Sequence, residues 1–168
     1  MHKIFLLVSL AAAAVMPIAA QNDLKDTVLK HLRTSRDFTL KVAEAMPAGS
    51  YDFKLTPAQM SFAEQMVHLS QGFTYFLSAF SGEKPNPPKP KSVSKDDVIA
   101  FMKTSFDHAI ETVSALSPQQ IDKTYSRGDR SRTGADVLLG MLDHVTHHRA
   151  SAEMYLRAKG ITPPEYEF

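Results

Sequence analysis

Apolar residues recur at helical spacing in four stretches of the chain. In the first stretch, about residues 23–45, they return every three or four positions and so lie on one face of a helix. In the second, Thr56 and Pro57 have the residue types of an N-cap and a first helical position, and Ser81–Gly82 marks the end. This second stretch carries a stripe of large apolar residues: Phe62, Met66, Leu69, Phe73, Phe76 and Phe80. Both stretches predict amphipathic helices.

Two further helices are predicted in the second half of the chain. One begins after a cap formed by Ser94 and Asp97, and the other begins after Thr133 and Asp136 and stops before Gly160. The proline-rich stretch that leads to Ser94 predicts an extended connection, because proline lacks an N–H donor and clashes with a preceding helical turn. No segment shows the sustained alternation of a strand. The sequence therefore predicts the all-α class, as a four-helix bundle with a Pro-rich crossover connection between helices 2 and 3.

The N-terminal segment has the layout of a secretory signal peptide. Lys3 lies in a short basic start, residues 4–15 are apolar, and small residues follow up to Ala20. The apolar run is too short for a comfortable membrane span. We therefore predict a signal peptide over residues 1–20 and a mature bundle domain over residues 21–168, exported to the periplasm or the cell exterior. An uncleaved anchor is the alternative.

The balance of charges narrows the range of partners. The chain has 19 Lys and Arg against 18 Asp and Glu, and removal of a signal peptide that contains Lys3 leaves 18 of each. A neutral chain lacks the basic surface that nucleic-acid binding requires. The absence of cysteine excludes disulfides and thiolate metal ligands. We expect a small-molecule substrate, no nucleic acid and no membrane contact after signal cleavage. The sequence is compatible with a homodimer.

Three histidines fall within five positions of the last predicted helix, in LDHVTHHRAS (residues 142–151). With Val137 set at zero and ~100° per residue, His144 lies at ~340° and His148 at ~20°, within the inward apolar stripe. His147 lies at ~280°, on the flank. Two inward imidazoles four residues apart have the spacing of helical zinc sites. The same spacing also fits core histidines that hydrogen-bond to neighbouring side chains.

A metal site needs a third ligand, and two histidines elsewhere are candidates. His68 lies beside the aromatic stripe of the second helix, on a flank of small and polar residues that can line a cavity. His31 lies on the inward side of the first helix. The alternative interpretation of His68 is a half-exposed polar residue. Glu64, Tyr155 and Arg149 are polar residues near these histidines in the sequence, and none of them is assigned a catalytic role.

Two motifs link the chain to a known family. One is the histidine after an aliphatic residue in the second helix, in MVHLSQ (residues 66–71). The other is HVTHHRASAEMYLRAKGITPPEY (residues 144–166), where a histidine pair is followed by Arg and by a tail of the form YLR, KG, PP and Tyr. In these motifs and in the order of its elements, the chain resembles the DinB/YfiT-like family (DinB superfamily) over residues 22–168. It departs from that family at Ala150–Ser151, where Gly and Gln are common.

The resemblance implies a crossover bundle that binds one divalent metal ion through His68, His144 and His148. Three neutral imidazoles leave the ion an open position, as in catalytic rather than structural sites, and they suit Zn, Ni or Fe. Relatives in the wider family resemble thiol-dependent transferases and isomerases. We therefore expect an exported metal-dependent enzyme of transferase, isomerase or hydrolase type. The alternative is a non-catalytic metal-binding or interaction bundle.

Overall fold

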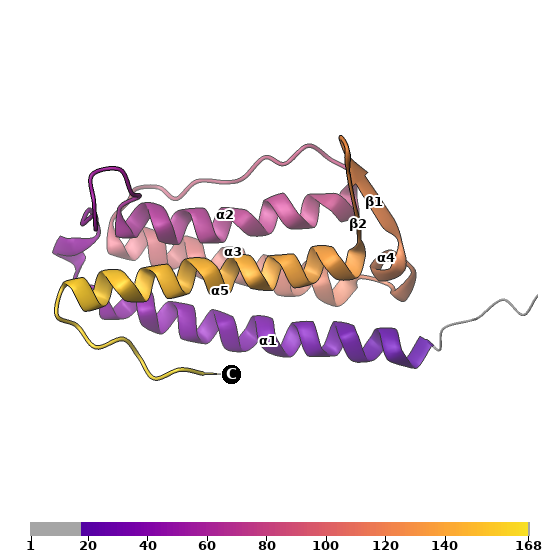
Figure 1. Ribbon diagram of the computed structural model, residues 1–168, viewed down its shortest axis with the longest axis horizontal. Helices are drawn as coiled ribbons and strands as arrows, with labels where there is room; N and C mark the ends of the chain where they lie inside the picture. Colours follow the sequence, from indigo (N-terminus) through magenta and orange to yellow (C-terminus); the bar gives the residue numbers. More distant parts are fainter. Residues whose placement is uncertain (1–17, 168) are drawn as a thin grey trace, which may run out of the picture.

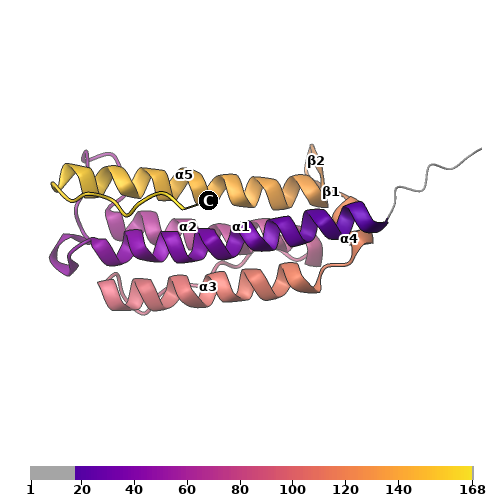
Figure 2. The ribbon, with the colours of Figure 1, turned by 90° about the horizontal axis from the view of Figure 1, so that it is seen from below.

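The computed structural model describes residues 18–167, and most of the predicted signal peptide lies outside them. Long helices make up the molecule and lie side by side along its length (Figures 1 and 2). Helix α2 packs against α3 and α5, and α1 packs against α3 and α5 on the other side. The bounds of the four main helices are α1 Ile18–Ala45, α2 Phe62–Ser81, α3 Lys95–Ala115 and α5 Gly134–Ala158. The predicted all-α bundle is confirmed, and no described helix combines the length and apolar character needed to cross a bilayer.

The core is built from the apolar faces that the sequence pattern predicted. Each of the four helices contributes side chains that are almost completely buried, so removal of apolar surface from water favours this arrangement of the helices. The largest fully buried side chains are Phe38, Phe62, Phe73, Phe106, Leu32, Met46, Met66, Leu69, Met102, Ile121, Leu138 and Met141.

The chain between α2 and α3 runs back along the bundle from one end to the other (Figure 1). As a result, α2 and α3 run in the same direction. Residues 83–94 contain no buried side chain and no regular helix or strand. One contact ties this segment to the middle of α2: Gln71 Nε2 donates a hydrogen bond to the carbonyl oxygen of Pro88, with a donor–acceptor distance of 2.8 Å. The segment therefore covers one side of α2 without joining the core.

Helix α2 begins later than its sequence predicted. Its N-cap is Ser61, whose Oγ accepts from the Glu64 amide at 3.2 Å, while Glu64 Oε2 accepts from the Ser61 amide at 2.6 Å. Thr56 instead opens a turn, in which its carbonyl oxygen accepts from the Gln59 amide. The predicted start at Thr56 was wrong because Ser61 and Glu64 form a reciprocal capping box that satisfies two backbone donors at once. Helix α1, in contrast, begins earlier than predicted, at Ile18.

A short hairpin between α3 and α5 is the second departure from the sequence prediction. A single turn of helix, α4 (Pro118–Asp122), precedes antiparallel strands β1 (Thr124–Arg127) and β2 (Arg130–Thr133). Gly128 has φ 62° at the first position of the two-residue turn, which is the conformation that a type II′ hairpin requires there. The expectation of no strands was therefore wrong for these residues, although the hairpin leaves the fold class unchanged.

Replacing Gly134 by alanine should destabilise the protein by about 1–3 kcal/mol, the range for overpacking at a site that cannot relax. A Cβ at Gly134 would lie 2.7 Å from the Ile121 carbonyl oxygen and 2.8 Å from Ile121 Cα, and closer still to the Gln120 carbonyl oxygen. These are backbone atoms of α4, so no side-chain rotation relieves the contact. Urea denaturation followed by circular dichroism measures the change. Gly49→Ala is the control, since nothing lies within 4 Å of its added Cβ, and equal stability of both variants would contradict the packing argument.

Candidate metal centre

Three histidines from two neighbouring helices come together beside the core, where His68 is exposed and His144 and His148 are half-buried. His68 lies on α2, and His144 and His148 lie one turn apart on α5. The ring centroids are 4.6 Å apart for His68 and His148, 5.4 Å for His68 and His144, and 4.4 Å for His144 and His148. One ligand atom from each ring can be chosen so that all three lie within 4.8 Å of one another. We call these three side chains the histidine cluster.

The other histidines stay outside the cluster. His147 is exposed on α5, as its position on the flank predicted, although its ring centroid is 4.8 Å from that of His148. His31, the second candidate for a third ligand, lies on α1 and is not among the residues brought together. His108 lies on α3, where it lines a different cavity with Leu77. The structure thus brings together the three residues that the family resemblance implied.

Gly72 makes room for one of the three rings. It lies on α2, one turn after His68, and is buried against His144. A Cβ at this position would lie 2.5 Å from His144 Nδ1 and closer still to its Cε1. The His144 ring also neighbours Phe76, one turn further along α2, with ring centroids 5.6 Å apart. Because Gly72 has no side chain, the His144 imidazole can approach α2 closely enough to meet His68.

Gln65 is the polar partner of the cluster that sequence reasoning missed. Its side chain is buried on α2, and its Nε2 lies 2.8 Å from His148 Nδ1. The amide can present either its NH₂ or its carbonyl oxygen to the ring, so it can hold either tautomer. When the carbonyl oxygen accepts from Nδ1–H, Nε2 of His148 keeps a lone pair for a ligand. Metal-binding histidines commonly have such a partner on their second nitrogen.

Three polar residues considered in the sequence have structural contacts instead. Glu64 caps α2 and lies 3.6 Å from Lys54 Nζ. The Tyr155 hydroxyl donates to the carbonyl oxygen of Met60 at 2.6 Å, so it braces the chain before α2. Arg149 is buried with its guanidinium 4.6 Å from the Phe38 ring centroid. None of the three is in the histidine cluster.

The local environment keeps two of the rings neutral at pH 7. Burial, together with the charges that His68 and His147 would carry, lowers the pKa of His144 from 6.5 to about 4. Burial and the charge on His144 lower the pKa of His148 to about 4. A neutral imidazole has a lone pair to offer, whereas a protonated one has none. These two rings are therefore ready to act as ligands across the physiological pH range.

The same shifts predict how the stability of the metal-free protein depends on pH. The unfolded chain protonates His144 and His148 near pH 6.5 and the folded chain only near pH 4, so the unfolded state binds more protons in that window. The stabilisation from these rings should therefore be fully present above pH 6.5 and be lost as the pH drops towards 4. Because both rings are half-exposed, solvent screening reduces the full ~3 kcal/mol per ring to on the order of 1 kcal/mol. Urea denaturation of the parent and of a His144→Gln/His148→Gln variant measures this slope.

The double variant should show the shallower pH dependence, and His147→Gln is the matched control from the same helix. Carboxylates titrate in the same window in all three proteins, so the difference between variants isolates the two rings. A double variant with the slope of the parent would contradict the assignment.

Cavities adjoin the cluster on more than one side. One of ≈ 380 Å³ is lined by His68, Gln71, Gly72, Tyr75, Phe76, Pro87 and His144. Another of ≈ 420 Å³ reaches His148 beside Gln65 and Tyr155. The proline-rich segment forms part of the wall on the His68 side, through Pro87 and, in a third cavity, through Lys89 and Pro90. A small molecule therefore has access to the histidine cluster.

Comparison with known proteins agrees with this architecture. A DinB-like protein of Bacillus subtilis, YjoA, superposes with a TM-score of 0.73 at 22% identity, over 83% of this chain and 96% of that one. A DinB-like protein of Bacillus cereus superposes with a TM-score of 0.73 at 15% identity, over 84% of this chain and 97% of that one. No curated protein matches the chain significantly. The DinB family pattern matches residues 19–168, nearly the whole sequence, and the chain therefore belongs to the DinB family.

Proposed function

We propose that this DinB-family chain is a metal-dependent enzyme that binds one divalent ion through His68, His144 and His148. The observation that carries the proposal is the convergence of three imidazoles, with ligand atoms within 4.8 Å of one another, beside an accessible cavity. Three nitrogens around one ion with bonds of ~2.0–2.1 Å lie about 3.3 Å apart, so small side-chain rotations bring the three rings to a shared ion.

The donor set fits a borderline transition-metal ion. Imidazole nitrogens suit Zn, Ni and Fe, and the lack of any carboxylate in the cluster argues against Mg or Ca, which prefer oxygen ligands. The lowered pKa values of His144 and His148 keep both rings available to such an ion. When bound, the ion would act as a Lewis acid towards a molecule in its open position.

The cavity favours an enzyme over a metal store. A storage or structural site closes around its ion with a fourth protein ligand, whereas a catalytic site keeps a position for substrate. Among the described residues, the cluster offers three ligands, and the space beside His68 and His144 is ≈ 380 Å³, within the range of small-molecule sites. The supported chemistry is transfer, isomerisation or hydrolysis of a small molecule at the ion.

A metal titration of protein purified without a histidine tag tests the metal site. We expect one Zn, Ni or Fe(II) per chain, and failure to bind any of them would refute the proposal. Cobalt substitution tests the open position, because the visible spectrum of Co(II) reports its ligands. Addition of a small thiol or azide should change that spectrum. A spectrum unaffected by either would leave a closed, non-catalytic metal site as the function.

We propose further that the protein is exported, with residues 1–20 removed. The proposal is supported by the basic start at Lys3, the short apolar run and the small residues before Gln21. N-terminal sequencing of the protein produced in a bacterium that exports it should give Gln21 or a residue close to it. A chain that keeps Met1 in the cytoplasmic fraction would refute export.

A further inference from the structure

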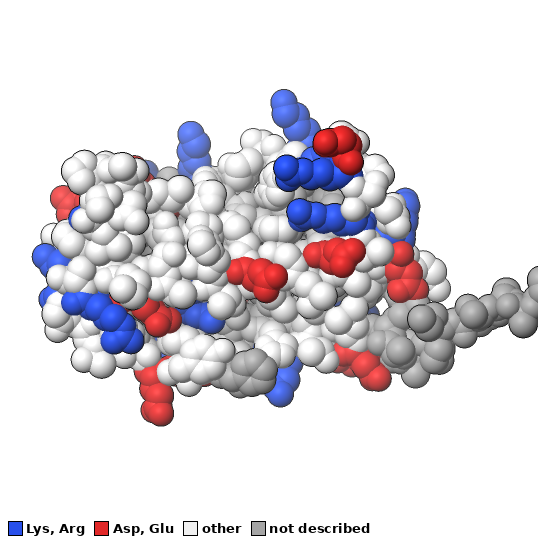
Figure 3. Space-filling view, viewed as in Figure 1, with Lys and Arg blue, Asp and Glu red and all other residues white. Residues whose placement is uncertain are grey.

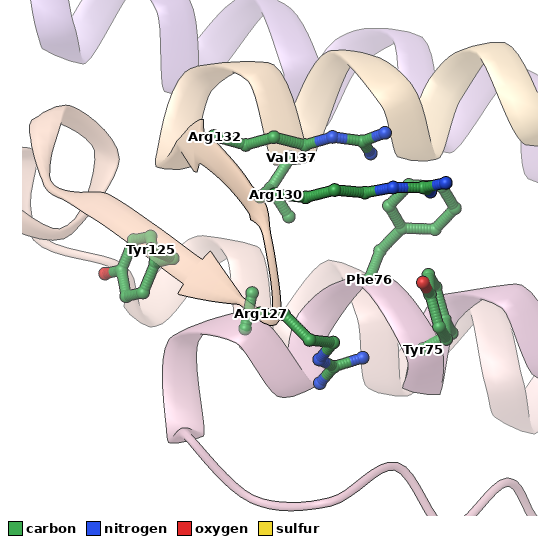
Figure 4. A pocket seen from close by; sticks show the side chains of 8 residues that line it. Tyr75, Phe76, Tyr125, Arg127, Arg130, Arg132 and Val137 are labelled. Carbon is green, nitrogen blue, oxygen red and sulfur yellow. The ribbon is translucent and has the colours of Figure 1, made fainter.

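Three arginines converge at the hairpin end of the bundle, next to the histidine cluster. Arg127 extends from β1, and Arg130 and Arg132 extend from β2 in a common direction over Phe76 (Figure 4). Together with Tyr75, Phe76, Ala79, Tyr125 and Val137 they line a cavity of ≈ 90 Å³. We call this space the arginine pocket. Figure 3 shows basic side chains at this end of the molecule, with acidic side chains beside them.

The hairpin register places all three guanidiniums on one face. Arg127 pairs with Arg130 across the strands, and Tyr125 pairs with Arg132. Paired residues of an antiparallel ladder lie on the same face, and residues two apart along a strand do so too. Like charges directly opposite one another destabilise a hairpin. The arrangement therefore opposes folding of the hairpin unless negative charge lies between the side chains.

In the part of the chain that the structure describes, the acidic side chains near the pocket do not pair with its arginines. The ion pairs of the described residues involve none of the three guanidiniums. Asp136, which Arg132 influences electrostatically, is held by the Thr133 amide and hydroxyl in the cap of α5. Asp129 occupies the exposed turn between the strands. The three arginines can therefore still bind an anion from solution.

One of the arginines is already fixed in place. Arg127 Nη2 donates to Ser78 Oγ at 2.8 Å, and its guanidinium lies 5.2 Å from the Tyr75 ring centroid. These contacts tie β1 to α2 and orient the pocket. Arg130 and Arg132 can contact a ligand from the β2 side.

The arginine pocket and the histidine cluster are adjacent. Tyr75 and Phe76 line both the arginine pocket and the cavity at His68 and His144. Arg132 Nη1 lies 3.9 Å from the position that a Cβ on Gly140 would occupy, and Gly140 is one helical turn before His144 on α5. One turn of α-helix advances ~5.4 Å along the axis. A molecule of a few carbon atoms can therefore reach both sites.

We propose that the arginine pocket binds the oxyanion, carboxylate or phosphate, of a small-molecule substrate whose other end reaches the histidine cluster. The second half of this statement rests on the proposed function, and the first half does not. Guanidinium groups recognise both oxyanions through paired, charge-assisted hydrogen bonds. A cavity of ≈ 90 Å³ suits such a group, and the ≈ 380 Å³ beside the histidines takes the rest of the molecule.

Anion titrations of the metal-free full chain test the pocket independently of the metal. Inorganic phosphate and glutarate are titrated separately, and backbone amide signals of β1, β2 and Gly140 are followed by NMR. We expect saturable binding at these signals, weakened at least ~10-fold in Arg130→Gln/Arg132→Gln, as for loss of a charge-assisted hydrogen bond. This double variant keeps Arg127, which braces the hairpin. Arg33→Gln, at an exposed position on α1, should bind like the parent.

The relative affinities of the two probes show whether phosphate or carboxylate fits better. Absence of saturable binding, or equal binding by the parent and the double variant, would overturn the pocket. A glutarate titration of the zinc-loaded protein then tests whether one molecule contacts both the arginine pocket and the metal ion. Glutarate has a carboxylate at each end, so it should bind more tightly to zinc-loaded than to metal-free protein, and the gain should vanish in the double variant. Equal affinity with and without zinc would overturn the bridging, whereas loss of zinc binding itself would show in the metal titration.

Discussion

Replacing His144 or His148 by alanine should lower metal affinity by more than ~100-fold, because loss of a ligand exceeds the effect of losing a ligand's partner. His147→Ala should bind like the parent, since this exposed ring lies outside the cluster. Isothermal titration with zinc measures all three. The variants should stay folded, because the half-buried rings lie beside the core rather than in it.

Thermal unfolding by circular dichroism is the control for these three variants. If a variant loses both zinc binding and its helical circular dichroism signal, the histidine ring is needed for folding. Equal loss in the His147 variant, or retained binding in the other two, would refute the assignment of the ligands.

Replacing Gly72 by alanine should also weaken metal binding at least ~10-fold, within the range for loss of a group that positions a ligand. The added Cβ would occupy space now held by the His144 ring, which must swing away from His68. The helix itself should tolerate the change, since alanine is a better helix former than glycine by about 1 kcal/mol. Zinc titration and urea denaturation of the same sample separate the two effects.

A double-mutant cycle sharpens this prediction. If Gly72→Ala acts only by displacing the His144 ring, it should add little to His144→Ala, because the two changes remove the same interaction. Additive losses would show that Gly72 acts elsewhere. Wild-type affinity in the single variant would show that the ring has room to move and still bind.

The parts of the fold that the sequence predicted depend on local signals. Ser94, Thr133 and Asp136 lie at helix starts as expected, because capping hydrogen bonds join residues three apart and need no tertiary contact. The start at Thr56 was wrong because two caps were available, and the choice between them depends on tertiary backbone hydrogen bonds, such as that from the Ala63 amide to the Tyr51 carbonyl oxygen. The hairpin had a readable signal in Gly128–Asp129, since a Gly–Asp pair between short polar strands favours a two-residue turn.

The residues of the site also divide into those that a local pattern predicts and those whose roles depend on tertiary contacts. The helical period alone places His144 and His148 on one face. The flank of small and polar residues beside His68 favours it over His31, and the family motif adds to that preference, because spacing along one helix does not say which residue of another helix lies opposite. Gln65 and Gly72 belong to the flank of His68 that the sequence predicts to line a cavity, but their contacts with His148 and His144 could not be predicted, since they depend on the distance between α2 and α5.

The proline-rich segment has a consequence for how this family can diversify. Residues 83–94 form part of the cavity walls, yet no side chain in them is buried. Substitutions there change the space beside the histidine cluster while the core, and with it the free energy of folding, stays almost the same. Mutations that create a new specificity usually lower stability, but under the proposed function the two properties depend on different parts of this chain. If the histidine cluster acts as proposed, we expect relatives to vary most in substrate preference where they vary in this segment.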